Sequence, residues 1–497
     1  MTQHPLLRSF RLVCKPEQVE RVEDILTAQG FSFIEEPFSP LARRLVREPF
    51  PIGASIAARF GYIYVQDRSS MLPPLALDPE PGAAVLDMCA SPGSKTGLLG
   101  QLAGETGFVL GNEPSKARLG TLRRNLQQLG LFCCATASHP GEQIPLPGPG
   151  QALDDAGAPC EGWPHILLDP PCSGWGTVDK HPQAARLWQG DKVRPLVALQ
   201  RKLLAEAARL LRPGGLVSYS TCTTNSAENE EQVRYALEEL GLVFVPVAPP
   251  QGFAFDEPVL PGMEGVLRVP TGPDGQGFFV ALLQKPHNDE NETRARRAAE
   301  PSRGGENGEG AAPGGTPFGE TPPVGTAGPG RDFFVRPWDR DSRFVGERRR
   351  HGKGPRGKHA GPTFITRESL DGPLLESAKL PQGDLAVYSD VIHFLPARRK
   401  GLIPERFAWK GHAIGRLGRG GEARAFAHLR GLMPDAETAA RNGAAVLNLD
   451  EPAPLLDLLS GQSLIVDPAV QELGLYFRGL PLCRLPVKGR RAVLPPL

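Results

Sequence analysis

VLDMCASPGSKTGLLGQL, residues 85–102, is the stretch that decides the fold. An apolar run ends in Asp87, a loop of small residues follows, and a helical pattern begins at about Lys95. A strand, a glycine-containing turn and a helix in this order place free backbone N–H groups around a mononucleotide-type cofactor. The spacing is neither the dinucleotide GxGxxG nor the phosphate-loop GxxxxGKS/T. An ordinary β-turn-α crossover without a ligand would have a similar sequence, so the rest of the chain has to distinguish it from a cofactor site.

Length and composition set the outer limits. The chain has 497 residues, enough for about three domains. Its net charge of +1 excludes a globally basic polyanion binder, so nucleic acid would need local charge clusters. No apolar stretch approaches the roughly 20 residues that span a bilayer, and the start lacks a signal-peptide core. We therefore expect a cytoplasmic protein without a membrane partner. We also expect it to be a monomer. The eight cysteines lack metal-ligand spacing, and we expect no metal.

Strand-like runs alternate with helical patterns after the first loop. We expect the further strands at residues 107–111, 132–137, 165–169 and 216–220, and a final hairpin at 265–269 and 278–283. This alternation predicts a doubly wound, parallel α/β sheet of the Rossmann-like type, whose ligands bind at the carboxyl ends of the strands. Asp87, Glu113, Asp169 and Cys222 all fall at such ends. Glu113, at the tip of the second strand, is placed to accept hydrogen bonds from ribose hydroxyls.

Composition divides the chain into four parts. We expect a small α/β module at residues 1–65, the Rossmann-like domain at 66–287, a disordered linker rich in Gly, Pro, Glu and Arg at 288–332, and a basic segment with a β-rich domain at 333–497. Aromatic residues alternate with cations between Phe333 and Lys358, as single-stranded nucleic acid binding requires. In the first module, cations that could line an RNA path are Arg8, Arg11, Lys15, Arg43, Arg44 and Arg47. A solvated charged face remains the alternative for both segments.

Two cysteines follow strands at the same edge of this sheet, Cys172 in DPPCSG and Cys222 in STCT. A lone cysteine is most often a small buried hydrophobe. Together, beside Asp169, the pair fits a specific reaction. Carbon 5 of a pyrimidine is too weak a nucleophile to attack a methyl sulfonium, but a thiolate adding to carbon 6 converts the ring into an enamine that can.

Four motifs, in this order and spacing, resemble those of the Sun-type (RsmB/RsmF-like) RNA cytosine-5 methyltransferases: VLDMCASPGSKT, GNEPSKAR, LLDPPCSG and STCTTNSAENEEQV. GYIYVQDRSSMLPPL is similar to the segment that precedes the cofactor loop in that family. The resemblance is strong over residues 60–285. It continues more weakly into GHAIGRLGRGG and LYFRGLPLCRLPVKGRRAV, which resemble a tail domain related to the PUA type.

The resemblance implies roles for individual residues. Cys222 would be the nucleophile, Cys172 would assist release of the covalent adduct, and Asp169 would hold the cytosine edge and border the cofactor. Glu113 would bind the ribose of S-adenosyl-L-methionine and Arg118 would brace that acid. The loop around the methionine and ribose would consist of Cys89, Ala90, Ser91, Pro92, Gly93, Ser94 and Lys95. The family usually has an aspartate for the adenine amino group where this chain has Pro140.

These features predict methyl transfer from S-adenosyl-L-methionine to C5 of a cytidine in ribosomal RNA, free or within a ribosomal subunit. Three alternatives remain: a transfer RNA cytosine-5 methyltransferase, an amino-group methylase in which DPPC varies a DPPY-type motif, and a non-catalytic RNA-binding ribosome assembly factor. Cys222 argues against amine methylation, because that reaction needs no covalent partner. The presence of both cysteines and of Lys95 argues against the assembly factor.

Overall fold

The computed structural model describes residues 8–151, 159–177, 193–272, 276–287, 363–404 and 407–494. The described residues all belong to one compact unit. The expected linker at 288–332 and the basic segment between Phe333 and Lys358 lie outside the described residues. Within the described residues, no helix has the length and apolar character needed to cross a membrane.

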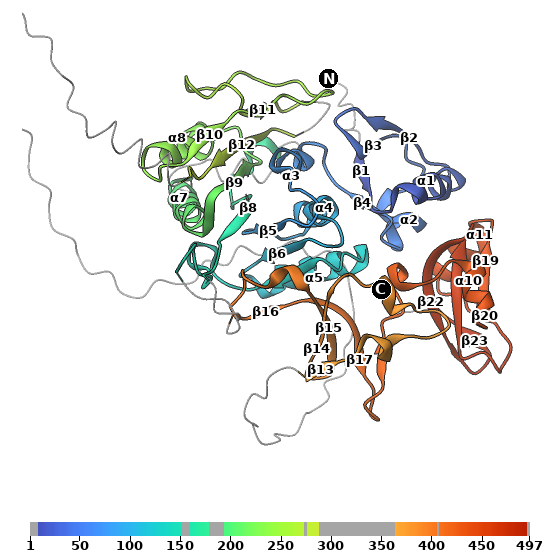
Figure 1. Cartoon of the computed structure of the whole chain (residues 1–497). Coiled ribbons are helices and arrows are strands. Elements are labelled where there is room, and N and C mark those ends of the chain that lie inside the picture. Colours follow the sequence, from blue (N-terminus) through green and yellow to red (C-terminus); the bar gives the residue numbers. More distant parts are fainter. Residues whose placement is uncertain are drawn as a thin grey trace, which may run out of the picture. The chain divides into compact units, whose positions relative to one another are not determined.

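A nine-stranded mixed sheet forms the centre of the described unit, with strand order β10-β12-β9-β8-β5-β6-β7-β16 and β11 paired to β12 (Figure 1). The five strands from β9 to β7 are parallel, and the edge strands are antiparallel. The doubly wound, Rossmann-like prediction is therefore confirmed. The strands are β5 (Ala84–Asp87), β6 (Phe108–Asn112), β7 (Cys134–Ala137), β8 (Trp163–Leu168), β9 (Leu211–Thr221), β10 (Val243–Val245), β11 (Leu267–Val269), β12 (Phe278–Gln284) and β16 (Trp409–Lys410).

Helices cover both faces of this sheet. The helices are α3 (Leu72–Leu77), α4 (Ser94–Ala103), α5 (Lys116–Leu129), α7 (Val193–Leu210) and α8 (Glu230–Glu238). One core cluster joins α7 and α8 to the sheet through Leu203, Leu204 and Val233. A second cluster joins α4 and α5 through Leu99 and Leu122. Because both faces are covered, the central strands β5 and β6 are buried along their whole length, which explains their nearly continuous apolar sequence.

The N-terminal module is a four-stranded antiparallel sheet in the order β2-β3-β1-β4, with α1 and α2 beside it. Arg11 and Arg43, which the sequence suggested for an RNA path, are buried here. Arg11 donates to Gln66 and Gln101, and Arg43 is paired with Glu23. Both therefore stabilise the module and are not available to RNA. The elements are β1 (Ser9–Leu12), α1 (Val19–Ala28), β2 (Ser32–Glu36), β3 (Ser39–Arg47), α2 (Ile56–Arg59) and β4 (Ile63–Val65).

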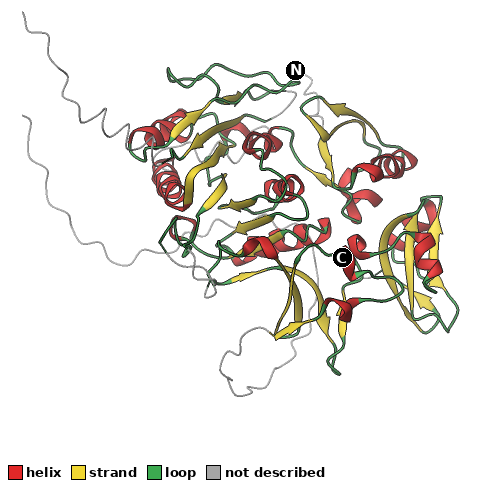
Figure 2. Cartoon of the chain, in the orientation of Figure 1, coloured by secondary structure: helices red, strands yellow, loops and turns green. Residues whose placement is uncertain are grey.

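The C-terminal part is rich in strands, as expected (Figure 2). One five-stranded sheet has the order β13-β14-β15-β17-β18 and a second has the order β19-β21-β22-β23-β20. The elements are β13 (Thr363–Ile365), β14 (Gly383–Tyr388), β15 (Val391–Pro396), β17 (His412–Leu417), β18 (Ala423–Ala425), α10 (Ala436–Arg441), β19 (Ala445–Leu449), α11 (Ala453–Leu459), β20 (Leu464–Ile465), β21 (Glu472–Phe477), β22 (Leu480–Lys488) and β23 (Arg491–Ala492).

Part of this C-terminal region belongs to the central sheet. Trp409 of β16 pairs with Ala137 of β7, and Leu402, Ile403 and Phe407 join the main core cluster. Residues 402–404 and 407–410 lie within the range 333–497 expected for the basic segment and β-rich domain. Their apolar contacts join them to the edge of the Rossmann-like sheet.

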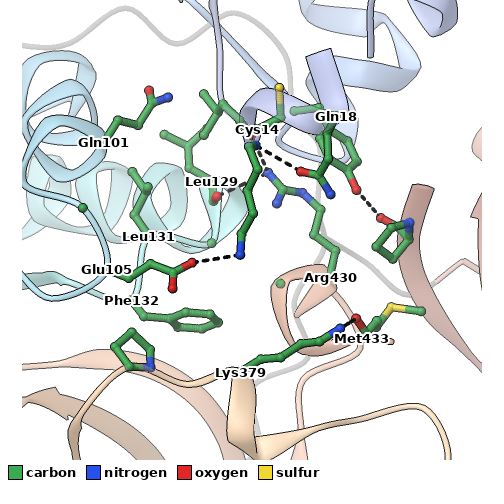
Figure 3. Close-up of a pocket in the computed structure, with 18 of the residues that line it drawn as sticks. Cys14, Gln18, Gln101, Glu105, Leu129, Leu131, Phe132, Lys379, Arg430 and Met433 are labelled. Carbon is green, nitrogen blue, oxygen red and sulfur yellow. Dashed lines mark hydrogen bonds and ion pairs between the residues drawn. The ribbon is translucent and has the colours of Figure 1, made fainter. Parts of the chain in front are cut away.

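Arg430 lies where the N-terminal module, the end of α5 and the C-terminal part meet (Figure 3). Its guanidinium donates to the carbonyls of Phe60, Gly61, Val13 and Leu129, and it stacks 4.1 Å from the centre of the Tyr62 ring. A cavity of about 570 Å³ opens beside it, and neither Cys172 nor Cys222 lines this cavity. The guanidinium thus connects three parts of the chain, since Arg430 of the C-terminal part donates to carbonyls of the N-terminal module and of α5.

Replacing Arg430 with alanine should lower the free energy of unfolding by about 2–3 kcal/mol, because several carbonyls lose a charged donor. Urea denaturation measures this. Arg490→Ala is the matched control, since Arg490 is exposed in a turn, and should change stability by less than about 0.5 kcal/mol. Equal stability of the two variants would contradict the connecting role of Arg430.

Candidate active site

Two thiols meet at the carboxyl edge of the central sheet. Cys222 follows β9 directly and Cys172 lies in the loop after β8. Because β8 and β9 are neighbouring parallel strands, their ends lie side by side. The two Sγ atoms are 3.2 Å apart. The chain therefore brings together two half-buried cysteines that are separated by 50 positions.

The two thiols differ in acidity. The hydrogen bond from Cys172 lowers the pKa of the Cys222 thiol, although burial acts to raise it, and the positive charge of Lys95 acts in the same direction as the hydrogen bond. The same contact, together with burial, raises the pKa of Cys172 well above its ordinary value. Cys222 is therefore the more acidic of the two thiols, and Cys172 keeps its proton to higher pH. A thiolate is the nucleophilic form of cysteine, so the pair is chemically asymmetric.

Asp169 lies beside the thiols, after β8, and joins them to the cofactor loop. Its Oδ2 is 2.7 Å from Nζ of Lys95, and its Oδ1 accepts a hydrogen bond of 2.9 Å from Ser220 Oγ. Burial acts to lower the pKa of Lys95, but the charge and hydrogen bond of Asp169 raise it overall. Lys95, expected around the methionine, thus extends from the start of α4 to the catalytic edge. Ser220 is not among the site residues expected from the sequence. The only sequence feature that points to it is its position two residues before Cys222.

The loop from Cys89 to Gly93 connects β5 to α4. Gly93 caps the helix with a φ of +104°, a conformation that favours glycine, and Ala90 N donates to Asn112 O of the neighbouring strand. Asp87 Oδ2 accepts from Thr96 at 2.6 Å. Among the described residues, the buried Oδ1 of Asp87 has no hydrogen-bond partner, and burial raises the pKa of this carboxyl to about 7.

Glu113 follows β6, and its side chain is almost fully buried. Its Oε1 accepts from Ser115 N at 2.8 Å, and its Oε2 is 3.4 Å from Nη1 of Arg118. Arg118 also donates from Nη2 to Ser91 O at 2.9 Å. One arginine therefore links the acid at the second strand to the loop after the first strand.

Pro140 lies in a loop that β6 holds in place. Asn112 Nδ2 donates to His139 O, and His139 N donates back to Asn112 Oδ1. The His139 ring lies 4.7 Å from the Phe407 ring, so a C-terminal segment packs against this loop. No sequence pattern marks that contact, because Phe407 is far away along the chain.

These residues fit S-adenosylmethionine. The backbone cradle at Gly93, the unpartnered acceptor on Asp87 and the buried carboxylate of Glu113 are suited to a ligand that carries cationic groups and ribose hydroxyls. The cofactor supplies an electrophilic methyl group. The fold and the site together define the class of S-adenosylmethionine-dependent methyltransferases.

Residues 74–284 match the family described as 16S rRNA methyltransferase RsmB/F. Proteins named ribosomal RNA small subunit methyltransferase F are similar to it: the one from Cronobacter sakazakii is 35% identical over 302 residues, and the one from Salmonella heidelberg is 36% identical over 294 residues. Each alignment covers 57% of this chain and 58% of the relative, so the chain spans little more than half the length of the curated relatives it matches.

Solved structures are also similar. The protein PH0851 is 30% identical, with a TM-score of 0.50, over 57% of this chain and 60% of that one. A methyltransferase homolog from Pyrococcus horikoshii is 32% identical, with a TM-score of 0.46, over 57% of this chain and 88% of that one.

Replacing Glu113 with alanine should weaken binding of S-adenosylmethionine by roughly 1–3 kcal/mol, because two hydrogen bonds to a charged acceptor are lost. Calorimetric titration of the full chain measures this. Glu80→Ala, at an exposed position in the turn before β5, is the control. Unchanged affinity in the Glu113 variant would overturn the assignment to the ribose.

Proposed function

We propose that this protein transfers a methyl group from S-adenosylmethionine to C5 of a cytidine in RNA, forming 5-methylcytosine through a covalent adduct between Cys222 and C6. The observation that carries the proposal is the pair of thiols 3.2 Å apart, with pKa values shifted in opposite directions. C5 methylation needs a nucleophile that adds first and a second group that acts later. An asymmetric pair of cysteines supplies both.

The first step uses Cys222 and Asp169. The Cys222 thiolate forms a bond to C6, and the electron pair of the C5–C6 double bond becomes available at C5. The Asp169 carboxylate accepts a hydrogen bond from the exocyclic amino group and fixes the ring over the thiolate. Lys95, 2.7 Å from Asp169, holds this carboxylate in position through an ion pair. With the cofactor bound, C5 would take the methyl group as the sulfur–methyl bond breaks, and the electron pair of that bond would stay on the sulfur of the departing thioether.

The second step uses Cys172. While Cys222 is a thiolate, it keeps Cys172 protonated. Once the Cys222 sulfur is bonded to carbon, this negative charge is gone and the pKa of Cys172 falls. Cys172 can then lose its proton and act as the base that takes the hydrogen from C5. The electron pair of that C–H bond restores the double bond, the S–C6 bond breaks, and Cys222 leaves as a thiolate.

The substrate proposal is ribosomal RNA, because the matched family and the curated relatives carry that substrate in their names. A transfer RNA cytidine would need the same chemistry and remains the alternative substrate. Amine methylation does not use a covalent nucleophile, so it leaves the thiol pair unexplained. We further propose that the protein acts as a monomer in the cytoplasm, on free RNA or on a ribosomal subunit.

Replacing either cysteine with alanine should separate the two roles. Cys222→Ala removes the nucleophile, so neither adduct nor methylated product should form. Cys172→Ala leaves the attack intact but removes the base, so the methylated adduct should accumulate as an enzyme-RNA complex. Incubation with RNA and cofactor, followed by a denaturing gel, would reveal it as a slow, nuclease-sensitive band.

Cys160→Ala is the matched control, because this buried cysteine precedes β8 whereas Cys172 follows the other end of that strand. It should neither trap RNA nor lose activity. Trapping by Cys222→Ala without trapping by Cys172→Ala would reverse the two roles. Full activity of the Cys222 variant would overturn the mechanism.

The basic segment should contribute affinity and not chemistry. Changing Arg348, Arg349 and Arg350 to glutamine should weaken RNA binding and reduce the slope of log K against log salt by up to about 2, because each phosphate contact on single-stranded RNA contributes about 0.7. Affinity for the cofactor should not change. Changing Arg294, Arg296 and Arg297 removes the same charge from a stretch without aromatic residues and should have the smaller effect. Equal effects would show that charge alone matters.

A further inference from the structure

A short turn after Cys222 contacts the loop that carries Cys172. Glu228 ends the 3-10 helix Ser226–Glu228, and its side chain is fully buried. Its Oε1 accepts from Ser173 N at 2.9 Å and from Gln200 Nε2 at 3.0 Å, and its Oε2 accepts from Ser173 Oγ at 2.6 Å. Since Ser173 directly follows Cys172, this carboxylate fixes the backbone on one side of that thiol.

The next residue, Asn229, does the same for Cys222. Its Oδ1 accepts from Thr221 Oγ1, and its Nδ2 donates to Thr223 O at 2.9 Å. One amide therefore holds the two residues that flank the nucleophile. Asn229 is also fully buried.

Further contacts connect the two loops. Ser173 Oγ and Thr223 Oγ1 are 2.9 Å apart, so the residues that follow the two cysteines touch each other. Gln200, which is bonded to Glu228, also donates to Pro171 O at 3.0 Å. Cys172 is thus held through the residue before it and the residue after it. A buried carboxylate is costly unless its oxygens find donors, so Glu228 strongly favours the arrangement in which Ser173 supplies them.

We propose that Glu228 and Asn229 are positioning residues, which hold the thiols of Cys172 and Cys222 at hydrogen-bond distance. The hydrogen bonds described above lead from these two side chains to Ser173, Thr221 and Thr223, so their effect on the thiols passes through those three residues. The consequence for methyl transfer rests on the proposed function. The consequence for the thiols does not, because it concerns the protein alone.

The decisive variant is Glu228→Gln in the full chain. Glutamine keeps the shape but replaces one acceptor oxygen with a donor, so the contact with Ser173 Oγ is disturbed. Glu238→Gln, at an exposed position of the adjacent helix α8, is the matched control. Thermal unfolding and calorimetric titration with S-adenosylmethionine first check that each variant is folded and that its cofactor affinity lies within about twofold of the parent.

Two readouts then report on the thiols without RNA. The first is the pH midpoint of iodoacetamide alkylation of Cys222, measured on its peptide by mass spectrometry. Loss of the hydrogen bond from Cys172 raises the pKa of Cys222, so the midpoint should move to higher pH in Glu228→Gln. The second is the rate at which diamide joins Cys172 to Cys222. Both thiols give up a proton and an electron, the S–S bond forms, and diamide becomes the hydrazine; this rate should fall by about tenfold, since displaced sulfurs meet less often.

Ser173→Ala is the second variant, because it removes the hydroxyl that donates a hydrogen bond to Glu228 Oε2. It should shift the alkylation midpoint and the cross-linking rate in the same direction by a smaller amount. If Glu228→Gln does not fold, this variant tests the positioning role. With RNA, kcat should fall by about ten- to a hundredfold in Glu228→Gln while KM for the cofactor stays constant.

A folded Glu228→Gln variant with the parental alkylation midpoint and cross-linking rate would overturn the positioning role. So would a folded Ser173→Ala variant with both parental values if Glu228→Gln does not fold. A parent protein that shows the thiol behaviour but methylates no RNA would overturn the proposed function and leave the positioning role supported.

Discussion

The hydrogen bond between the thiols of Cys172 and Cys222 is the interaction on which the proposed chemistry depends. It raises the pKa of Cys172 and lowers that of Cys222, so two identical side chains differ in acidity and suit the different roles proposed for them, nucleophile for Cys222 and later base for Cys172. Such a contact is sensitive to small displacements, because a hydrogen bond weakens steeply with distance and angle. The surrounding structure therefore has to hold the loops that carry Cys172 and Cys222 at a fixed distance. The parallel pairing of β8 with β9 is the first feature that does so.

An ion pair connects this carboxyl edge of the sheet to the loop after β5. The ion pair between Lys95 and Asp169 joins the first turn of α4 to the end of β8. The same lysine therefore depends on the geometry of the loop after β5 and supplies positive charge near Cys222. The loop after β5 and Cys222 are thus not independent, since movement of α4 would change both the ion pair with Asp169 and the positive charge that acts on the Cys222 thiol.

The sequence predicts this site well where a whole pattern carries the information. The apolar runs of β5, β6 and β8 end in Asp87, Glu113 and Asp169, and a parallel sheet necessarily brings such ends to one edge. Single polar residues carry no comparable signal. Glu228 lies in the acidic stretch SAENEE, and nothing in that stretch distinguishes the buried carboxylate from exposed ones such as Glu238. Burial is a property of the packed fold.

Burial is equally hard to predict from the sequence for charged residues of the N-terminal module. Arg11 and Arg43 look like surface cations in the sequence, yet both are buried, because distant groups such as Gln66 and Glu23 satisfy their guanidinium donors.

Long-range pairing also explains β16, which consists of two residues that no sequence pattern marks as a strand. Its contact with β7 brings Phe407 against His139, beside the loop where Pro140 replaces the usual aspartate. The C-terminal part therefore borders the cofactor side of the sheet, and a change there can alter the cofactor site without touching either cysteine.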